Sequence, residues 1–166
     1  KIKLPSKAIA YIPKGDASPP FSCSVSHGPQ AWIALGKQLL GTPYTWGGTT
    51  PEGFDCSGLI QFLLKQHGIV IKRDAHDQCF NEPKLEPVAL DDLKPGDLLY
   101  FGDTKKISHV AMYLGANNNN DSNNDGDAFG EVLEATRSGR PSVKISKLSE
   151  PRLKDSLMHA RRVRQE

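Results

Sequence analysis

The sequence predicts an α+β fold, with N-terminal helices packed on a central antiparallel β-sheet. Helical patterns come first, between residues 29 and 68, and strand patterns dominate from residue 97 onward. The chain has 166 residues, near the size of one domain, and 37% of them are hydrophobic. One core can therefore form without being stapled by disulfides or metals.

Two helices are expected in the first half of the chain. The first runs from Pro29 to Leu40, because proline suits the first turn of a helix and Gly41 can end it. The second begins at about Cys56 and ends near Gly68, after a long loop over residues 41–54. Its apolar residues predict a helix that is buried on most sides: Leu59, Ile60, Phe62, Leu63 and Leu64.

Five segments then have strand character: 97–102, 108–115, 131–136, 142–146 and 157–163. Between the second and third strands, Asn117 to Asp127 is very polar and predicts an extended hairpin loop. Asp121–Gly126 matches the first half of a calcium-binding loop, but the twelfth position is Val132 instead of glutamate. A solvated insertion is the better interpretation, so no metal or other cofactor is expected.

Residues 1–28 are interpreted as an N-terminal arm or linker, and residues 29–166 as one domain. Lys7–Pro13 could form a strand, and Gly15–Pro20 has the composition of a linker. This segment could pack on the domain or be the remnant of a lost neighbour. Because the chain starts at Lys1 and not at Met, we expect a processed or truncated form.

The charge of the chain favours few classes of partner. The 21 basic and 19 acidic residues give a net charge of +2, which is too mild to indicate nucleic-acid binding. The sequence contains no run of about 18 apolar residues that would span a membrane. Seven basic residues between Lys144 and Arg164 are interpreted as a solvated face, with attraction to an anionic cell wall as the alternative. A monomer is expected.

The three cysteines differ in setting. Cys23 and Cys79 could pair in an oxidising compartment, although two plain thiols explain the sequence as well. Cys56 lies where the long loop enters the second helix, where unpaired N–H groups and the positive end of the helix dipole favour a thiolate. The same N–H groups can hold an oxyanion. Cys56 is therefore a candidate nucleophile, unless it is only a small apolar residue that caps a buried helix.

A thiolate nucleophile needs a base that takes and returns a proton. Of the five histidines, His109 is the best candidate, because it lies at the start of a strand that can hold its ring rigidly. The other four are expected in loops, at a helix end or in packing positions: His27, His67, His76 and His159.

Four segments occur in this order: Tyr44-Thr-Trp-Gly-Gly48, Phe54-Asp-Cys-Ser-Gly58, Leu93-Lys-Pro-Gly-Asp97 and Ser108-His-Val-Ala-Met-Tyr-Leu114. Together they closely resemble the NlpC/P60 family, bacterial-type cell-wall endopeptidases with a papain-like core. The resemblance extends from about residue 30 to residue 163 and implies that residues 29–166 form a catalytic domain.

The resemblance also implies roles for single residues. Cys56 would be the nucleophile and His109 the base, and the hydroxyl of Tyr44 would lie beside the cysteine and assist the oxyanion. Asp55 would line the substrate groove and could engage a free substrate amine, whereas Arg73 could equally be a surface charge. The residues implied to bind substrate are Tyr44, Asp55, Ser57, Arg73 and Ser108.

One position departs from the family pattern. Relatives usually carry a polar residue, most often histidine, on the strand after the catalytic histidine, where it orients the imidazole. The matching residue here is Glu134. A carboxylate can fix the tautomer, stabilise the imidazolium and raise the histidine pKa. If Glu134 instead faces solvent, Glu131 or an asparagine would have to serve.

The resemblance implies hydrolysis of peptidoglycan stem peptides, between D-γ-glutamyl and the following diamino acid, through a thioester on Cys56. Two alternatives stay open. One is an amidase or acyltransferase of the same fold, and the other is a catalytically silent wall-binding module, which the unusual Glu134 keeps open. A secreted, periplasmic or cell-wall-associated location is expected, although no signal peptide is visible.

Overall fold

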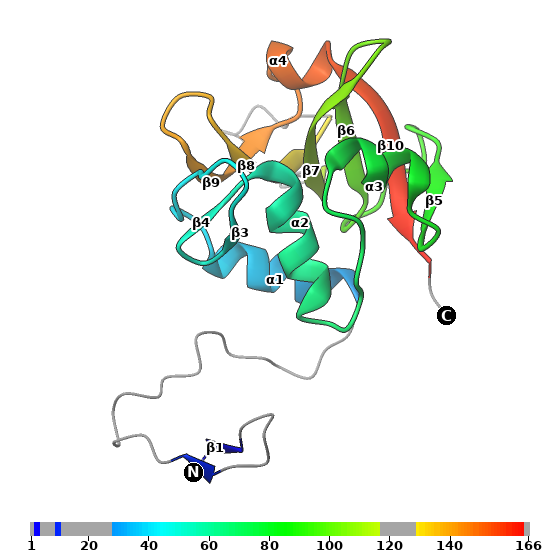
Figure 1. Ribbon diagram of the computed structural model, residues 1–166. Coiled ribbons are helices and arrows are strands. Elements are labelled where there is room, and N and C mark those ends of the chain that lie inside the picture. Colours follow the sequence, from blue (N-terminus) through cyan, green and yellow to red (C-terminus); the bar gives the residue numbers. More distant parts are fainter. Residues whose placement is uncertain (1, 4–8, 11–27, 117–128, 165–166) are drawn as a thin grey trace.

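Six strands form one antiparallel sheet in the order β5-β10-β6-β7-β8-β9 (Figure 1). The computed structural model describes residues 2–3, 9–10, 28–116 and 129–164 of the chain. The strands of the sheet are β5 (Leu85–Val88), β6 (Leu98–Gly102), β7 (Ile107–Gly115), β8 (Glu131–Thr136), β9 (Ser142–Lys147) and β10 (Leu157–Val163). The five strands expected from the sequence are confirmed to within one residue at either end.

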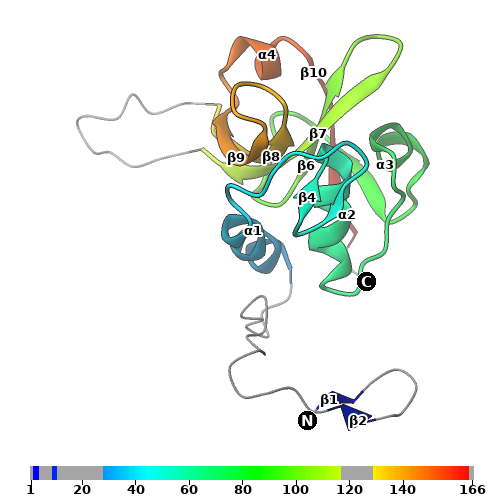
Figure 2. The ribbon, with the colours of Figure 1, turned by 60° about the vertical axis from the view of Figure 1, so that its left-hand side comes forward.

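Three helices pack on one face of this sheet: α1 (Pro29–Gln38), α2 (Cys56–Lys65) and α3 (Ala75–Asn81) (Figures 1 and 2). Leu59, Ile60, Leu63 and Leu64 of α2 are completely buried, which confirms the expected core helix. Gly36 brings α1 close to β8, because a Cβ at this position would stand only 2.1 Å from the side chain of Leu133. The α+β class with helices on an antiparallel sheet is therefore confirmed.

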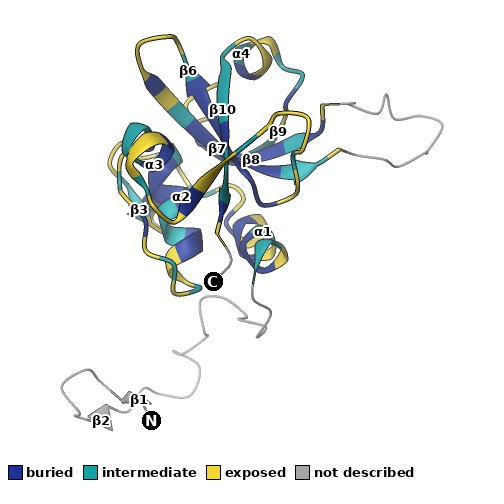
Figure 3. Cartoon of the chain, turned by 90° about the vertical axis from the view of Figure 1, so that its right-hand side faces the viewer, coloured by how far each residue is buried: buried dark blue, intermediate teal, exposed yellow. Residues whose placement is uncertain are grey.

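The opposite face of the sheet carries a smaller apolar cluster. The short helix α4 (Pro151–Lys154) lies on this side (Figure 2). Its Leu153 is part of the cluster, and only 1% of this residue is exposed. Because both faces are covered, β6 and the middle of β7, residues 110–114, are continuously apolar instead of alternating, and buried residues concentrate there (Figure 3).

Five elements of the domain were not expected from the sequence: β5, α3, α4 and the short strands β3 (Thr49–Thr50) and β4 (Gly53–Phe54), which lie in residues 41–54, where a long loop was expected. β5 is an edge strand that contains Pro87, and α3 and α4 have only seven and four residues, too few to show a clear apolar period. Two further two-stranded ladders pair β1 (Ile2–Lys3) with β2 (Ile9–Ala10), and β3 with β4.

Several expectations fall wholly or partly outside the described residues. Ile9–Ala10 of the expected strand Lys7–Pro13 lies in β2, but its other residues lie outside, as do Gly15–Pro20, Cys23, His27 and Asp121–Gly126. Cys79 is a free, buried thiol. Within the described ranges, no helix combines the length and hydropathy needed to cross a membrane. The same ranges contain no cluster of three or more His, Cys, Asp or Glu side chains suited to a metal ion.

Some of the basic residues of the C-terminal segment are paired with acidic residues of the fold. Arg152 forms ion pairs with Glu134 and Glu150, and Arg162 pairs with Asp97 and Asp92. At least three of the seven basic residues that the sequence places between Lys144 and Arg164 thus have an acidic partner, the third being Arg164 beside Glu86.

Candidate active site

Cys56 is the first residue of α2, and its side chain is half-buried. It shares a hydrogen bond with His109, which lies near the start of β7. Residues of a strand alternate between the two faces of the sheet, so His109, two residues before Ala111, faces the side that carries α4. The N-terminus of α2 and the start of β7 thus meet at the cysteine and the histidine.

Glu134 lies beside His109 on the neighbouring strand β8. Its Oε2 is 2.6 Å from Nε2 of His109, and none of its side chain is exposed. The alternative in which Glu134 faces solvent is therefore wrong. Because a carboxylate only accepts hydrogen bonds, Nε2 carries the ring proton toward Glu134, and Nδ1 is left for Cys56.

The pKa values of this pair are shifted in opposite directions. Burial alone lowers the pKa of His109, but hydrogen bonds with Cys56 and Glu134 outweigh it and raise the pKa to about 9. Burial alone raises the pKa of Glu134, but hydrogen bonds from His109 and Arg152 outweigh it and lower the pKa to about 2. At neutral pH the pair therefore consists of an imidazolium and a carboxylate.

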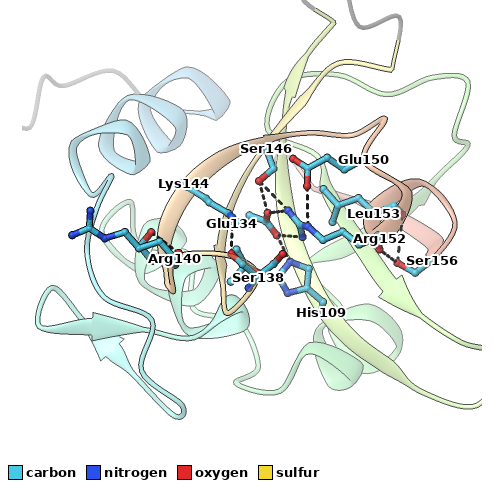
Figure 4. A network of polar contacts seen from close by, with 12 residues as sticks. His109, Glu134, Ser138, Arg140, Lys144, Ser146, Glu150, Arg152, Leu153 and Ser156 are labelled. Carbon is cyan, nitrogen blue, oxygen red and sulfur yellow. Dashed lines mark hydrogen bonds and ion pairs between the residues drawn. The ribbon is translucent and has the colours of Figure 1, made fainter.

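Two residues that the sequence analysis did not identify complete the surroundings of Glu134 (Figure 4). Ser146 of β9 donates to Oε1 over 2.6 Å, and Arg152 of α4 donates to both carboxylate oxygens. Ser146 could have been found from the register of the sheet, because Glu134 pairs with Lys144 and Ser146 is the diagonal neighbour on the same face. No local signal in the sequence points to Arg152.

Asp55 is the N-cap of α2 and ties the preceding loop to the helix. Its Oδ1 accepts from the N–H of Gly58 at 2.7 Å, and its Oδ2 accepts from the N–H of Gly47 at 2.9 Å. Arg73 donates to the same Oδ2 at 2.5 Å and to Oγ of Ser57 at 2.8 Å. Arg73 is therefore a partly exposed residue that is paired with this cluster.

The glycines of the two motifs allow the loop and the helix to touch. A Cβ on Gly58 would stand 2.0 Å from the carbonyl oxygen of Gly48, and that oxygen accepts from the N–H of Asp55. Behind the helix start, the completely buried Gln78 of α3 donates to the carbonyl of Ser57. The first turn of α2 is thus held from both sides.

Tyr44 lies close enough to Cys56 and Asp55 to respond to their charges. Burial, followed by the negative charges of these two residues, raises the pKa of Tyr44, so its hydroxyl keeps its proton and can donate a hydrogen bond. Arg137 lies over the rings of both Tyr44 and Trp46, with its guanidinium carbon 5.9 and 5.8 Å from the ring centroids. Trp46 is 80% exposed and forms an outer edge of this region.

The structure thus brings most of the expected site residues together. Cys56, His109 and Glu134 form one hydrogen-bonded series, and Asp55, Ser57 and Arg73 form a second cluster at the start of the same helix. Ser108 is an exposed residue next to His109. The arrangement places a thiol, a charged imidazole and the N-terminus of a helix at one point, which suits acyl transfer through a covalent thioester.

Comparisons with known proteins agree with the family resemblance of the sequence motifs. The chain is 39% identical over 130 residues to the gamma-DL-glutamyl hydrolase of Bacillus subtilis, covering 76% of this chain and 27% of that protein. It is 37% identical over 123 residues to the gamma-D-glutamyl-L-lysine dipeptidyl-peptidase of Bacillus cereus, covering 71% of this chain and 36% of that protein. The chain thus spans about a third of the length of these curated relatives.

A solved structure agrees over a complete domain. The NlpC/p60 domain of the peptidoglycan hydrolase SagA superposes with a TM-score of 0.61 at 28% identity, covering 84% of this chain and 100% of that domain. Residues 41–162 match the sequence profile of the NlpC/P60 family, and this range contains Cys56, His109 and Glu134. The chain therefore belongs to the NlpC/P60 family.

Proposed function

We propose that this chain is a cysteine endopeptidase that hydrolyses peptidoglycan stem peptides between D-γ-glutamyl and the following diamino acid. The observation that carries the proposal is the hydrogen-bonded series from Cys56 through His109 to the buried Glu134. The names of two relatives specify γ-glutamyl bonds, and that of a third specifies peptidoglycan. The proposed place of action is the cell wall.

In the proposed reaction, Sγ of Cys56 attacks the carbonyl carbon of the γ-glutamyl bond as a thiolate. The oxyanion that forms is held by N–H groups at the start of α2 and by the hydroxyl of Tyr44. The imidazolium of His109 then gives its proton to the leaving amine, and a thioester remains on Cys56. Glu134 keeps the ring oriented and stabilises its positive charge.

The second half of the reaction releases the acyl group. Neutral His109 takes a proton from a water molecule, which attacks the thioester carbon. The C–S bond then breaks, the acid departs, and Cys56 is released as the thiolate beside the imidazolium of His109. We propose that four residues bind the peptide beside the nucleophile: Asp55, Ser57, Arg73 and Ser108. The first three, which cluster at the start of α2, would bind the γ-glutamyl side of the peptide.

The proposal is tested by digesting defined muropeptides with the wild type, Cys56→Ala and Glu134→Gln, and by identifying the products by mass spectrometry. We expect the wild type to release fragments cut after D-γ-glutamyl, and Cys56→Ala to release none. Full release by Cys56→Ala would contradict the proposal. A parallel digestion with an added amine acceptor separates hydrolysis from acyl transfer, because transfer would yield amide products.

A further inference from the structure

Arg152 occupies an unusual place for a residue of a four-residue surface helix. Both of its terminal nitrogens donate to the carboxylate of Glu134, and its Nε donates to Oε2 of Glu150 at 2.9 Å (Figure 4). One of these nitrogens also lies 3.0 Å from Oγ of Ser146. The guanidinium thus links the completely buried Glu134 to the partly exposed Glu150.

The negative charge of Glu134 needs a second positive partner, because His109 loses its own positive charge during acyl transfer. While His109 is an imidazolium, it compensates the buried carboxylate directly. When its proton has left with the amine, the ring is neutral and Glu134 would be a completely buried carboxylate without a counter-charge. The bidentate guanidinium stays charged throughout the reaction, because it keeps its proton at all working pH values.

The helix α4 also has contacts that do not involve the guanidinium. Leu153, the next residue, is buried in the second apolar cluster, and the hydroxyl of Ser156 closes the helix by donating to the carbonyl of Arg152. The contacts of Leu153 and Ser156 thus add to those that Arg152 makes with Glu134 and Ser146.

The other charged groups around the pair are already engaged or lie on the nucleophile side. Lys144 is directly opposite Glu134 on β9, but its ammonium donates to the carbonyl of Ser138. On the side of the nucleophile, His109 faces Cys56. The charged groups Asp55, Arg73 and Arg137 act on the neighbouring Tyr44, whose hydroxyl keeps its proton. Among the described residues, Arg152 is the arginine that hydrogen-bonds Glu134.

We propose that Arg152 is a positioning residue for the reaction. It keeps the carboxylate of Glu134 oriented toward His109 and ionised, whether His109 is an imidazolium or a neutral ring. This inference rests on the proposed roles of Cys56, His109 and Glu134. If Arg152 has this role, its positive charge limits how far Glu134 can raise the pKa of His109. A proton shared by His109 and Glu134 is released more readily beside a permanent cation, so removing the cation must make it leave at higher pH.

The test uses the full chain and does not depend on the substrate. Cys56 is alkylated with iodoacetamide from pH 4 to 11, and the rate is measured by mass spectrometry on the peptide that contains Cys56. The alkaline limb of this profile reports the loss of the proton from the His109–Glu134 pair. For Arg152→Met we expect this limb to move up by about one pH unit. For Arg152→Lys, which keeps the positive charge but cannot donate through two nitrogens to both carboxylate oxygens, we expect a smaller shift.

Arg162→Met is the matched control. Arg162 also donates through two nitrogens to a buried carboxylate, that of Asp97, but this pair joins β10 to the start of β6 and takes no part in the proposed site. We expect this variant to lose stability and to keep the alkaline limb of the wild type. Circular dichroism on all variants confirms that each remains folded, and Arg152→Lys serves if Arg152→Met does not fold.

The outcomes separate the two proposals. A limb that stays in place or moves down in the folded Arg152 variants would overturn the role of Arg152 and leave the Cys56–His109 pair intact. A wild-type profile with the single limb of an ordinary thiol, near pH 8.5, would overturn the proposed function and the role of Arg152 together.

Discussion

Nε2 of His109 lies 2.6 Å from Oε2 of Glu134, and the carboxylate is completely buried. At this distance the carboxylate accepts a charge-assisted hydrogen bond from the ring. The contact fixes which nitrogen faces Cys56 and favours the imidazolium over the neutral ring. Glutamate at this position is therefore chemically equipped to replace the polar residue that the resemblance leads one to expect there.

Glu134→Gln is expected to lower kcat/KM on the order of 10²- to 10⁴-fold, because the amide keeps the shape of the side chain but cannot stabilise the imidazolium. The measurement is steady-state hydrolysis of a defined muropeptide. Glu150→Gln is the control, since Glu150 is partly exposed and contacts Arg152 but not His109. A loss of less than threefold in Glu134→Gln would show that the carboxylate has no part in the reaction.

The pH dependence of activity follows from the raised pKa of His109. Because this pKa is about 9, the ring keeps the proton needed by the leaving amine through the neutral range. We expect kcat/KM to hold up to about pH 9 and to fall above it. Glu134, with a pKa of about 2, stays ionised throughout and adds no limb near its ordinary value. Removing its negative charge must lower the pKa of His109, so the alkaline limb of Glu134→Gln should move down; a limb that stays in place argues against the coupling.

Asp55→Ala is expected to destabilise the fold by at least about 2 kcal/mol, because it removes a helix cap together with the contacts to Gly47 and Arg73. Urea unfolding measures the change. Asp74→Ala provides the comparison: Asp74 caps α3 with one hydrogen bond to the N–H of His76 and is exposed, so about 1 kcal/mol is expected. Equal losses in the two variants would mean that the Asp55 cluster adds nothing beyond an ordinary cap.

The contacts of Asp55 also predict how much a free N-terminal amine on the substrate matters. Both oxygens of Asp55 already accept from the N–H groups of Gly47 and Gly58 and from Arg73, so a substrate ammonium would have to compete with a guanidinium. We expect L-alanyl-D-γ-glutamyl-diamino acid peptides with free and acetylated N-termini to differ by less than about tenfold in kcat/KM, which corresponds to about 1.4 kcal/mol. Arg73→Met should free Asp55 and favour the free amine. A preference above a hundredfold in the wild type would mean that the free amine is required.

Much of the fold could be predicted from local sequence. Periodicity and turn residues are local properties, and they placed α1, α2 and the strands β6 to β10 nearly where the structure has them. β5, α3 and α4 were missed because they are short or contain proline, so that packing and pairing with distant residues decide their conformation more than their own sequence does.

The sequence by itself determined the nucleophile candidate and the base candidate, because each lies in a short motif, and the family resemblance added Glu134 as the expected partner of His109, with its orientation left open. Only the tertiary structure decided what surrounds them. Arg152 reaches Glu134 across 18 residues of chain, and Arg73 reaches Asp55 across another 18. A buried or capping carboxylate must find partners from wherever the sheet register and helix packing bring them, and a linear sequence does not contain those distances.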